Sequence, residues 1–498
     1  VRLLLVDSET KKPIGGMVRV YAEGSDEPLG LPNLLDRLRG LGKSEVRVGW
    51  QVVPVAGVET TLPPARLRLE AVAGLETALA RRDLDLTAGA NKGGGRREIT
   101  VELPVLFRPG ATGLAAGNTH LHLRNMTLAE ADAYLKQIPP ADQLRVLFIS
   151  YLERFKDDRT YITNEYPIGE VKRLAGTGVL YNNGEEHRHN FQAFGPGYGH
   201  VMFLDIRELV RPVSLGPGIT GAGHDDRPLG PGIAAARKQA GTVIWCHNDF
   251  GYEFLPHVLA GRLDALNVYD GSRSGTYADR YYRCLNAGLK LPISTGTDWF
   301  LYDFARVYAG VGDKPLTVAS WLEALRAGRT VATNGPLLTL EVDGQPVGST
   351  LKLEKPATVR VEAKAVGRHD FGKLQFVRNG EVIETAPAAK EGDRFVAQLR
   401  KPIRIDEPAW LAARIETVTR NEFDMPLFAH TSPVYVELGG NGVLRAEAVR
   451  ELLRELEQAR DTIRAKGSFS AEPARDAVLA LYDDAARTLR ERANRRGR

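Results

Sequence analysis

Histidines are concentrated in one part of the chain. The sequence has ten of them, and eight lie between His120 and His257. Two stand two residues apart in the segment Asn118-Thr119-His120-Leu121-His122. In a strand, residues i and i+2 share a face, so both imidazoles could reach one divalent ion. An isolated His-x-His spacing is common, and a pair of exposed strand histidines is the alternative.

Other residue types that bind metals follow along the chain, beside short apolar stretches that predict buried strands. They are Glu185 and Glu186 after 178–182, His200 before 201–205, His247 after 242–246, and Asp298 after 291–294. Parallel α/β folds collect functional groups at the carboxyl ends of strands, where loops converge. Imidazoles and carboxylates without thiolates suit Zn²⁺, Mn²⁺ or Fe²⁺, whereas Ca²⁺ needs only oxygen ligands. We therefore expect a divalent-metal site, with Zn²⁺ first and Mn²⁺ or Fe²⁺ as alternatives.

The elements that must position these residues alternate between strand and helix. Strands are predicted at 145–150, 178–182, 201–205, 242–246, 265–269 and 291–294, with helical stretches at 127–137, 230–240 and 277–288. Such alternation favours a parallel sheet or a barrel with right-handed crossovers.

The regions on either side of this α/β part have other patterns. Apolar residues alternate in residues 1–110 and again in 337–440, and each region predicts a β-sandwich. The tail places Val449, Leu452, Leu453, Leu456 and Ile463 on one helical face, and Val478, Leu481, Tyr482, Ala485 and Leu489 on another. We therefore expect four domains: a sandwich (1–110), a metal-binding α/β domain (111–336), a second sandwich (337–440) and an amphipathic helical hairpin (441–498).

The composition is that of a soluble globular protein. The 498 residues are 43% apolar and 26% charged, and the net charge of +4 gives no reason to expect nucleic acid as a partner. The apolar stretches are strand-length, far below the ~20 residues of a membrane helix. Two cysteines, Cys246 and Cys284, make no disulfide framework, and we expect them to be buried. The composition leaves open whether the protein forms a homo-oligomer and in which cellular compartment it works.

The order His-x-His, Glu, His, His, Asp resembles the PHP superfamily of metal-dependent hydrolases. A narrower likeness is to the CehA/McbA family, named for carbaryl hydrolases, and it is carried by the motifs at 118–122, 184–187, 199–200, 245–248, 296–300 and 329–336. The resemblance implies a distorted (β/α) barrel for the central domain. Exported relatives also carry a leading β domain, a following β-sandwich and a helical tail, which favours a periplasmic or secreted protein.

The resemblance also implies roles for individual residues. His120, His122 and Asp298 would hold one metal ion, His200 and His247 a second, and Glu186 would bridge them, with Glu186 and Asp298 also counted as catalytic. Glu185 competes as the bridge, but Gly184-Glu185-Glu186 matches a pattern with one residue between Gly and Glu. Trinuclear members use three further histidines that are missing here, which implies two ions or one.

Several residues near these motifs are candidates for the substrate side. His224 lies in a Gly/Pro-rich stretch that resembles a mobile loop over an active site, and His187 and His189 are further candidates. Arg306 could stabilise an oxyanion or carboxylate as a catalytic residue, with a structural ion pair as the alternative. His257 is expected at the surface. Asn118, Asn248 or Asp249 could orient the ligating imidazoles.

The leading functional hypothesis is a hydrolase that attacks the carbonyl of a small-molecule ester, carbamate or amide. Two divalent ions would lower the pKa of a bridging water and polarise the substrate oxygen. A phosphoesterase is the alternative, although Arg188, Arg227 and Arg306 are the only basic residues nearby in sequence. A non-catalytic protein with a structural metal is the third hypothesis.

Overall fold

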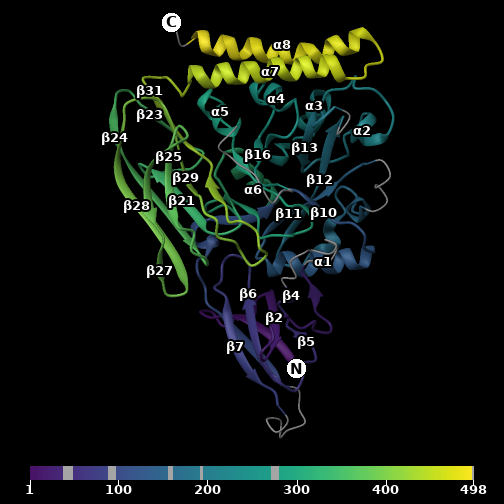
Figure 1. The fold of residues 1–498 in the computed structure, drawn as a ribbon, viewed down its shortest axis with the longest axis vertical. Helices are drawn as coiled ribbons and strands as arrows, with labels where there is room; N and C mark the ends of the chain where they lie inside the picture. Colours follow the sequence, from purple (N-terminus) through teal and green to yellow (C-terminus); the bar gives the residue numbers. More distant parts are fainter. Residues whose placement is uncertain (38–48, 88–96, 155–160, 191–193, 271–279, 496–498) are drawn as a thin grey trace.

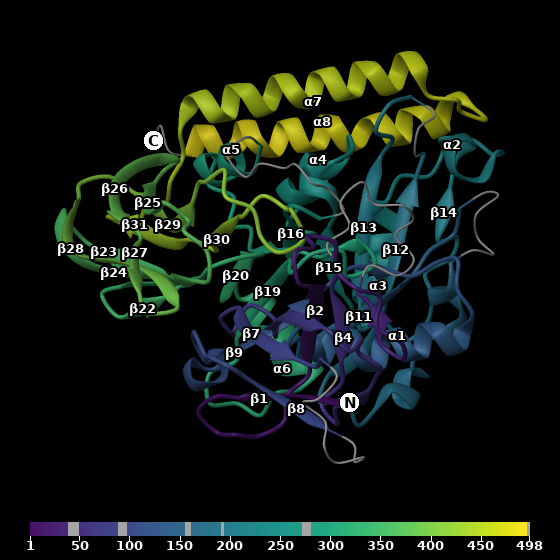
Figure 2. The same cartoon turned by 60° about the horizontal axis from the view of Figure 1, so that its bottom comes forward.

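The computed structural model describes residues 1–37, 49–87, 97–154, 161–190, 194–270 and 280–495. These residues form a mixed α/β fold with a β-rich part at the N-terminus, a second β-rich part near the C-terminus, and the α/β part between them (Figure 1). Two long helices, α7 (Ala446–Lys466) and α8 (Glu472–Arg495), lie side by side across the end opposite to the N-terminal strands (Figures 1 and 2).

The N-terminal residues form two small sheets that enclose an apolar cluster. The strands are β1 (Arg2–Asp7), β2 (Gly16–Ala22), β3 (Leu35–Asp36), β4 (Gln51–Val53), β5 (Val58–Glu59), β6 (Arg66–Val72), β7 (Ala80–Asp85) and β8 (Glu98–Leu103). Their orders are β5-β1-β8 and β3-β4-β2-β6-β7. Leu67, Leu69 and Ala71 of β6 all point into this cluster, as the alternation of their side chains predicts.

The central strands and helices follow one another as the sequence predicts, but the sheet is not purely parallel. The elements are β9 (Leu114–Asn118), β10 (Leu121–His122), α1 (Leu128–Ala141), β11 (Val146–Tyr151), β12 (Leu180–His189), β13 (Gly199–Leu204), β14 (Ser214–Leu215), α2 (Pro217–Thr220), α3 (Gly230–Lys238), β15 (Thr242–Trp245), α4 (Phe254–Leu259), β16 (Ala265–Asn267), α5 (Arg280–Asn286), β17 (Ile293–Ser294), β18 (Asp298–Trp299), β19 (Arg306–Gly310), α6 (Val318–Arg326) and β20 (Thr330–Thr333). Strand β13 pairs antiparallel with both β12 and β15. The segment 190–198 between β12 and β13 is too short for a parallel crossover, which needs a dozen or more residues.

The central strands run in the order β17-β16-β15-β13-β12-β11-β9-β19-β20. Its two ends are joined by a side chain, because Thr330 Oγ1 of β20 donates a hydrogen bond to the carbonyl of Ile293 of β17 at 2.6 Å. Within the described residues no backbone ladder pairs β17 with β20, so the strands do not form a closed barrel.

The sheet continues from β20 into the C-terminal β-rich part. It passes through β30 (Ala429–Thr431), β29 (Ala409–Ile415), β25 (Lys373–Arg378) and β26 (Glu381–Pro387), with β23 (Thr350–Leu353) and β31 (Val434–Leu438) alongside. A separate sheet has the order β22-β21-β24-β28-β27, from β21 (Leu337–Val342), β22 (Gln345–Pro346), β24 (Ala357–Gly367), β27 (Ala389–Glu391) and β28 (Arg394–Ile405). Asn379 and Gly380, both with positive φ, make the hairpin turn between β25 and β26.

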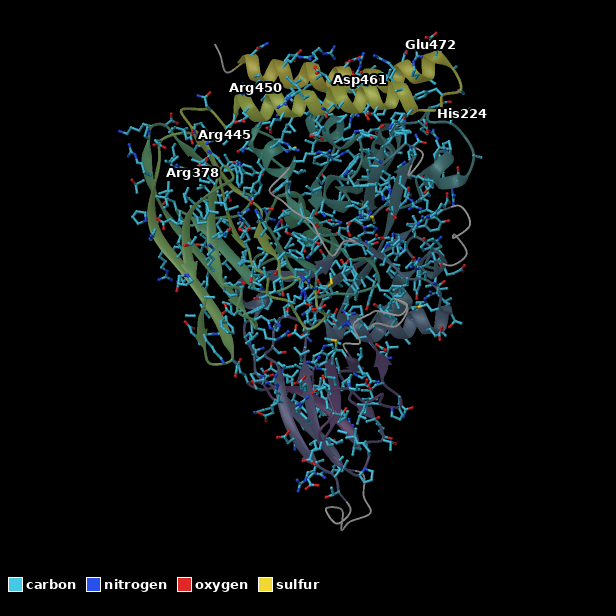
Figure 3. All side chains as sticks on the ribbon, in the orientation of Figure 1. His224, Arg378, Arg445, Arg450, Asp461 and Glu472 are labelled. Atoms are coloured by element: carbon cyan, nitrogen blue, oxygen red, sulfur yellow. The ribbon has the colours of Figure 1, made fainter. Side chains whose placement is uncertain are left out.

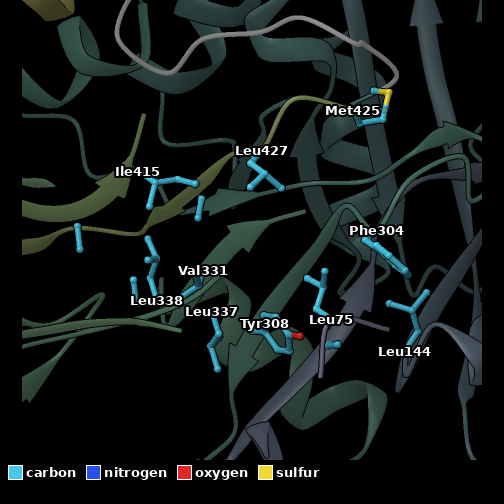
Figure 4. Packing of buried hydrophobic residues seen from close by; sticks show 14 of the residues in the cluster. Leu75, Leu144, Phe304, Tyr308, Val331, Leu337, Leu338, Ile415, Met425 and Leu427 are labelled. Atoms are coloured by element: carbon cyan, nitrogen blue, oxygen red, sulfur yellow. The ribbon is translucent and has the colours of Figure 1, made fainter. Parts of the chain in front are cut away.

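One large apolar cluster joins all three parts of the chain. Figure 4 shows Leu75 of the N-terminal part near Tyr308 of β19, and Leu337 and Leu338 of the C-terminal part near Val331 of β20. A second cluster contains the buried faces of α7 and α8, including Leu452 and Tyr482, as their periodicity predicts. Among the helices in the described ranges, none is both long and apolar enough to cross a bilayer.

A buried ion pair also ties the N-terminal part to the central part. Arg37 Nη2 lies 2.5 Å from Asp142 Oδ2, and neither side chain is more than 1% exposed. We expect Arg37→Met to lower the free energy of unfolding by about 3–5 kcal/mol, because it leaves a buried carboxylate without its partner. Urea unfolding followed by circular dichroism measures the loss. The double variant Arg37→Met/Asp142→Leu should lose less than Arg37→Met alone, and an equal or greater loss in the double variant would contradict this reasoning.

Candidate metal centre

The His-x-His segment lies where β9 passes into β10, against the strand that carries Asp298. Strand β10 pairs parallel with β18, with Leu121 opposite Asp298. The carbonyl of His120 accepts hydrogen bonds from the backbone N–H groups of Thr297 and Asp298. The side chain of Asn118 accepts from the N–H of His120 at 3.0 Å and donates to Thr297 Oγ1 at 2.9 Å. These bonds within the protein hold the two segments together without a bound ligand.

The six residues predicted as ligands converge in the structure. Their ligand atoms form two groups, each with all atoms within 4.8 Å of one another: His120, His122, Glu186 and Asp298 in the first, and Glu186, His200 and His247 in the second. Within the first group, His120 Nε2 and His122 Nε2 are 3.0 Å apart, and Asp298 Oδ1 is 3.5 Å from His120 Nε2. The imidazole centroids of His120 and His247 are 5.4 Å apart, so the two groups are adjacent.

Glu186 is the residue that the two groups share. Its Oε2 lies 3.1 Å from His122 Nε2, and its Oε1 lies 2.7 Å from His200 Nδ1 and 3.5 Å from His247 Nε2. Burial raises the pKa of this carboxyl, but the charges of Arg188 and His200 outweigh burial and hold it well below its usual value. Glu186 is therefore an anion with one oxygen toward each group.

Glu185 points to the other side of β12, as adjacent strand residues must. Its Oε1 lies 2.8 Å from His187 Nδ1, and its Oε2 accepts a hydrogen bond from the N–H of Val210 at 2.6 Å. Both carboxylate oxygens are thus used away from the cluster, whereas both oxygens of Glu186 face it.

Three of the imidazoles are oriented by acceptors behind them. His120 Nδ1 donates to Asp270 Oδ2 at 2.8 Å, and His122 Nδ1 donates to the carbonyl of Ser150 at 3.0 Å. His247 Nδ1 is 3.3 Å from the carbonyl of Asp270. Because carboxylates and carbonyls accept protons in hydrogen bonds, each Nδ1 carries a proton and each Nε2 is the ring nitrogen left to bind a cation at the cluster.

The donor set fits a divalent cation. Asp298 Oδ1 is buried and has no hydrogen-bond partner in the described part of the chain. Such an atom is costly unless a cation or a donor faces it. His247 and Asp298 both have positive φ, at 56° and 57°, a conformation that costs roughly 1–3 kcal/mol and concentrates at functional sites. Nitrogen and carboxylate ligands of this kind suit Zn²⁺, Mn²⁺ or Fe²⁺.

Cys246 is a further buried group beside the cluster. A ligand atom of Cys246 lies within 4.8 Å of ligand atoms of His120 and His247. Burial raises the pKa of its thiol to about 12, and the structure confirms that both cysteines are buried. From its sequence position, Cys246 was expected to be a buried small residue and not a ligand.

Asp270 lies directly behind His120 and was not among the residues predicted from the sequence. It is buried, and its side chain also accepts a hydrogen bond from Asn267 Nδ2 at 3.1 Å. Its position could have indicated this role, because Asp270 directly follows the predicted strand 265–269, just as other predicted ligands follow their own strands. Asn118, Asn248 and Asp249 were the residues predicted to orient the imidazoles. The side chain of Asn118 accepts from the backbone N–H of His120, and that of Asn248 accepts from the backbone N–H of Tyr269. The side chain of Asp249 lies outside the described residues.

Asp270→Asn is expected to lower metal affinity by about 10–100-fold, because a neutral amide orients and polarises the His120 imidazole less well than a carboxylate. Competition with a fluorescent zinc chelator measures the affinity. The control is Asp313→Asn, which removes the same charge at an exposed position. Equal affinity in the two variants would show that Asp270 does not support the centre.

The structure does not bring His224 to this cluster. His224 is exposed near the turn between α7 and α8 (Figure 3). The next two residues are bound to that turn: Asp225 Oδ2 accepts from the N–H of Ser468 at 2.6 Å and Asp226 Oδ1 from that of Ser470 at 2.9 Å. This placement corrects the expectation of a loop over the site, because the segment is fastened to the helical hairpin.

Arg306 is also placed elsewhere, and the structure shows the ion-pair alternative. Its side chain is fully buried, donates to the carbonyl of Asp142 at 2.7 Å, and lies 3.5 Å from Glu76 Oε1. Tyr308 OH also donates to Glu76 Oε1, at 2.7 Å. Arg306 thus joins the central part to the N-terminal part, which corrects the expectation that it faces a substrate.

Three other histidines are buried as well. His187 and His189 share the face of β12 that carries Glu185, with ring centroids 4.7 Å apart, so they point away from the cluster. His257, expected at the surface, is fully buried and its Nε2 lies 2.8 Å from Glu253 Oε2. Its partner carboxylate is what allows this polar ring to be buried.

Comparison with known proteins does not place the chain in a family. No family model matches it, and no curated protein matches it either.

Proposed function

We propose that this protein is a metal-dependent hydrolase that attacks the carbonyl carbon of an ester, carbamate or amide. The observation that carries the proposal is the position of Glu186, which directs one oxygen to a His/His/Asp group and the other to a His/His group. A carboxylate placed in this way can bridge two cations, and this is the role that we propose for Glu186. The proposal includes membership in the CehA/McbA family. It also includes a distorted barrel, which is supported by the hydrogen bond between Thr330 of β20 and Ile293 of β17.

Divalent ions held by these residues would supply Lewis-acid chemistry: they would lower the pKa of a bound water and polarise the substrate carbonyl oxygen. The protein's part is to hold the ligands in place. Asp270 and the Ser150 carbonyl keep the Nε2 atoms of His120 and His122 directed at the first position. Glu186 keeps the two positions adjacent and offsets the repulsion between two cations.

A phosphoesterase is the second candidate, and one observation favours it. Among the arginines considered from the sequence, Arg188 is buried and its charge acts on Glu186, so it lies at the site. Arg306 lies elsewhere, where it donates to the carbonyl of Asp142. Phosphoryl transfer is catalysed mainly by such cations around the phosphate. A purely structural metal is disfavoured, because closed structural zinc sites have four ligands and here six residues form two groups.

Metal analysis of the purified protein, together with parallel assays on three substrates, tests the proposal. The substrates are an aryl ester, an aryl N-methylcarbamate and a phosphodiester. We expect bound divalent metal and faster hydrolysis of the ester or the carbamate. Faster hydrolysis of the phosphodiester would replace the proposal by the second candidate. Bound metal without hydrolysis of any substrate would favour a binding protein.

A further inference from the structure

Arg188 is a buried cation beside the metal centre. It stands two residues after Glu186 on β12, on the same strand face, and directly opposite His200 on β13. The residue is 2% exposed. Its Nη2 donates to the carbonyl of Glu153 at 2.6 Å and its Nε to Ser214 Oγ at 3.5 Å. In the described ranges no carboxylate forms an ion pair with this guanidinium, although the charges of Glu186 and Asp298 act on it.

Arg124 is a second, half-buried arginine close to the centre. It stands two residues after His122, and its guanidinium carbon lies 4.9 Å from the ring centroid of Trp299. Its Nε is buried without a hydrogen-bond partner, and no carboxylate of the described chain pairs with it. A buried guanidinium nitrogen without an acceptor is unfavourable, so a ligand that supplies one is expected to bind there.

Two aromatic rings connect the arginines to the first metal group. Tyr161 and Trp299 are stacked with centroids 5.6 Å apart, and they lie 6.2 Å and 5.4 Å from the ring of His122. Arg124 forms a backbone bridge with Tyr161, and the charge of Arg188 interacts with Tyr161, Glu186 and Asp298. Both guanidinium groups therefore lie near the same aromatic pair, next to His122.

The charges around the centre favour an anionic ligand. Among the described residues, the buried carboxylates that belong to the two ligand groups or bond to their histidines are Glu186, Asp298 and Asp270. Two divalent ions, once bound, together with the buried Arg188 and the half-buried Arg124 would carry more positive charge than these three carboxylates can neutralise. An excess of buried positive charge is costly unless an anion compensates for it.

We propose that Arg124 and Arg188 bind an anionic group of the substrate, a carboxylate or a phosphate, beside the metal centre. Guanidinium groups pair with both anions through two parallel hydrogen bonds. The stacked rings of Tyr161 and Trp299 provide a flat wall for the adjoining part of the substrate. This inference rests on the proposed function, and it makes the natural substrate an anion instead of a neutral ester.

A matched pair of esters tests the inference. The two esters are p-nitrophenyl p-toluate and mono-p-nitrophenyl terephthalate, which differ in a methyl group replaced by a carboxylate, and p-nitrophenyl phosphate is the third arm. We expect kcat/KM for the terephthalate to exceed that for the toluate by about tenfold or more. Arg124→Gln and Arg188→Gln should each lower this ratio by about tenfold. The matched control is Arg207→Gln, which removes the same charge from an exposed residue.

Binding of benzoate, followed by isothermal titration calorimetry, gives a readout that is independent of hydrolysis. We expect its affinity to fall by about tenfold in each arginine variant, with unchanged metal content. If Arg188→Gln loses metal because it lies beside Glu186, Arg124→Gln still decides the question.

The outcomes separate this inference from the proposed function. Weaker benzoate binding in the arginine variants, without hydrolysis of any ester, would support the anion subsite and overturn the hydrolase. Equal hydrolysis of both esters, with benzoate affinity unchanged in both arginine variants, would overturn the subsite and leave the hydrolase. Preference for p-nitrophenyl phosphate with the same dependence on the two arginines would support the subsite and identify its anion as phosphate.

Discussion

Glu186→Gln is expected to reduce hydrolysis by about 100-fold or more and to lower the metal content of the purified protein. The reason is that Glu186 directs one carboxylate oxygen to each of the two ligand groups. An amide keeps the shape but loses the negative charge that, under the proposed function, holds both cations. Loss of a hydrogen-bond partner of a metal ligand already lowers metal affinity or activity by about 10–100-fold, so loss of a ligand shared by two sites should lower them at least as much. Steady-state kinetics and elemental analysis measure the two effects.

Glu185→Gln is the matched control, because it makes the same change one residue earlier on β12. Its side chain faces Val210 and His187, and an amide oxygen can still accept from the N–H of Val210. We expect this variant to keep its metal and most of its activity. Loss of both in Glu185→Gln, with both kept in Glu186→Gln, would move the bridge by one residue. Full activity in both variants would replace the two-ion proposal with a single ion held by His120, His122 and another ligand.

Removal of the metal by a chelator is expected to abolish hydrolysis and to leave the fold intact. The ligands are held by bonds within the protein, such as those from His120 to Asp270 and from His122 to Ser150, and the segments that carry them belong to a packed sheet. Far-UV circular dichroism and activity, recorded over the same range of chelator concentration, measure the two properties. Restoring Zn²⁺, Mn²⁺ or Fe²⁺ in separate samples should return activity and would identify the preferred ion.

Loss of the far-UV signal at the chelator concentration that removes activity would contradict this expectation. It would mean that metal binding supplies folding free energy, as in small structural zinc domains. The protein would then belong with the third hypothesis, a binding protein whose metal is structural.

The sequence by itself determined the local properties of this site. A spacing of two residues puts His120 and His122 on one strand face, and the same rule separates Glu185 from Glu186. The restriction of cation ligands to a few residue types made the six residues recognisable. The periodicity of α7 and α8 was equally local, because a helix of that length repeats its apolar face several times.

Only the tertiary structure decided which of these local features meet. The strand rule states that Glu185 and Glu186 face opposite sides, but not which side holds the histidines; that depends on the pairing of β12 with β13. Asp270 and His120 are 150 positions apart, and Glu76 and Arg306 are 230 positions apart. Such contacts follow from how sheets and helices pack over the whole chain, and no short-range pattern encodes them. Arg306 therefore stood out in the sequence but joins two parts of the fold, whereas Arg124 did not stand out and lies beside the candidate metal centre.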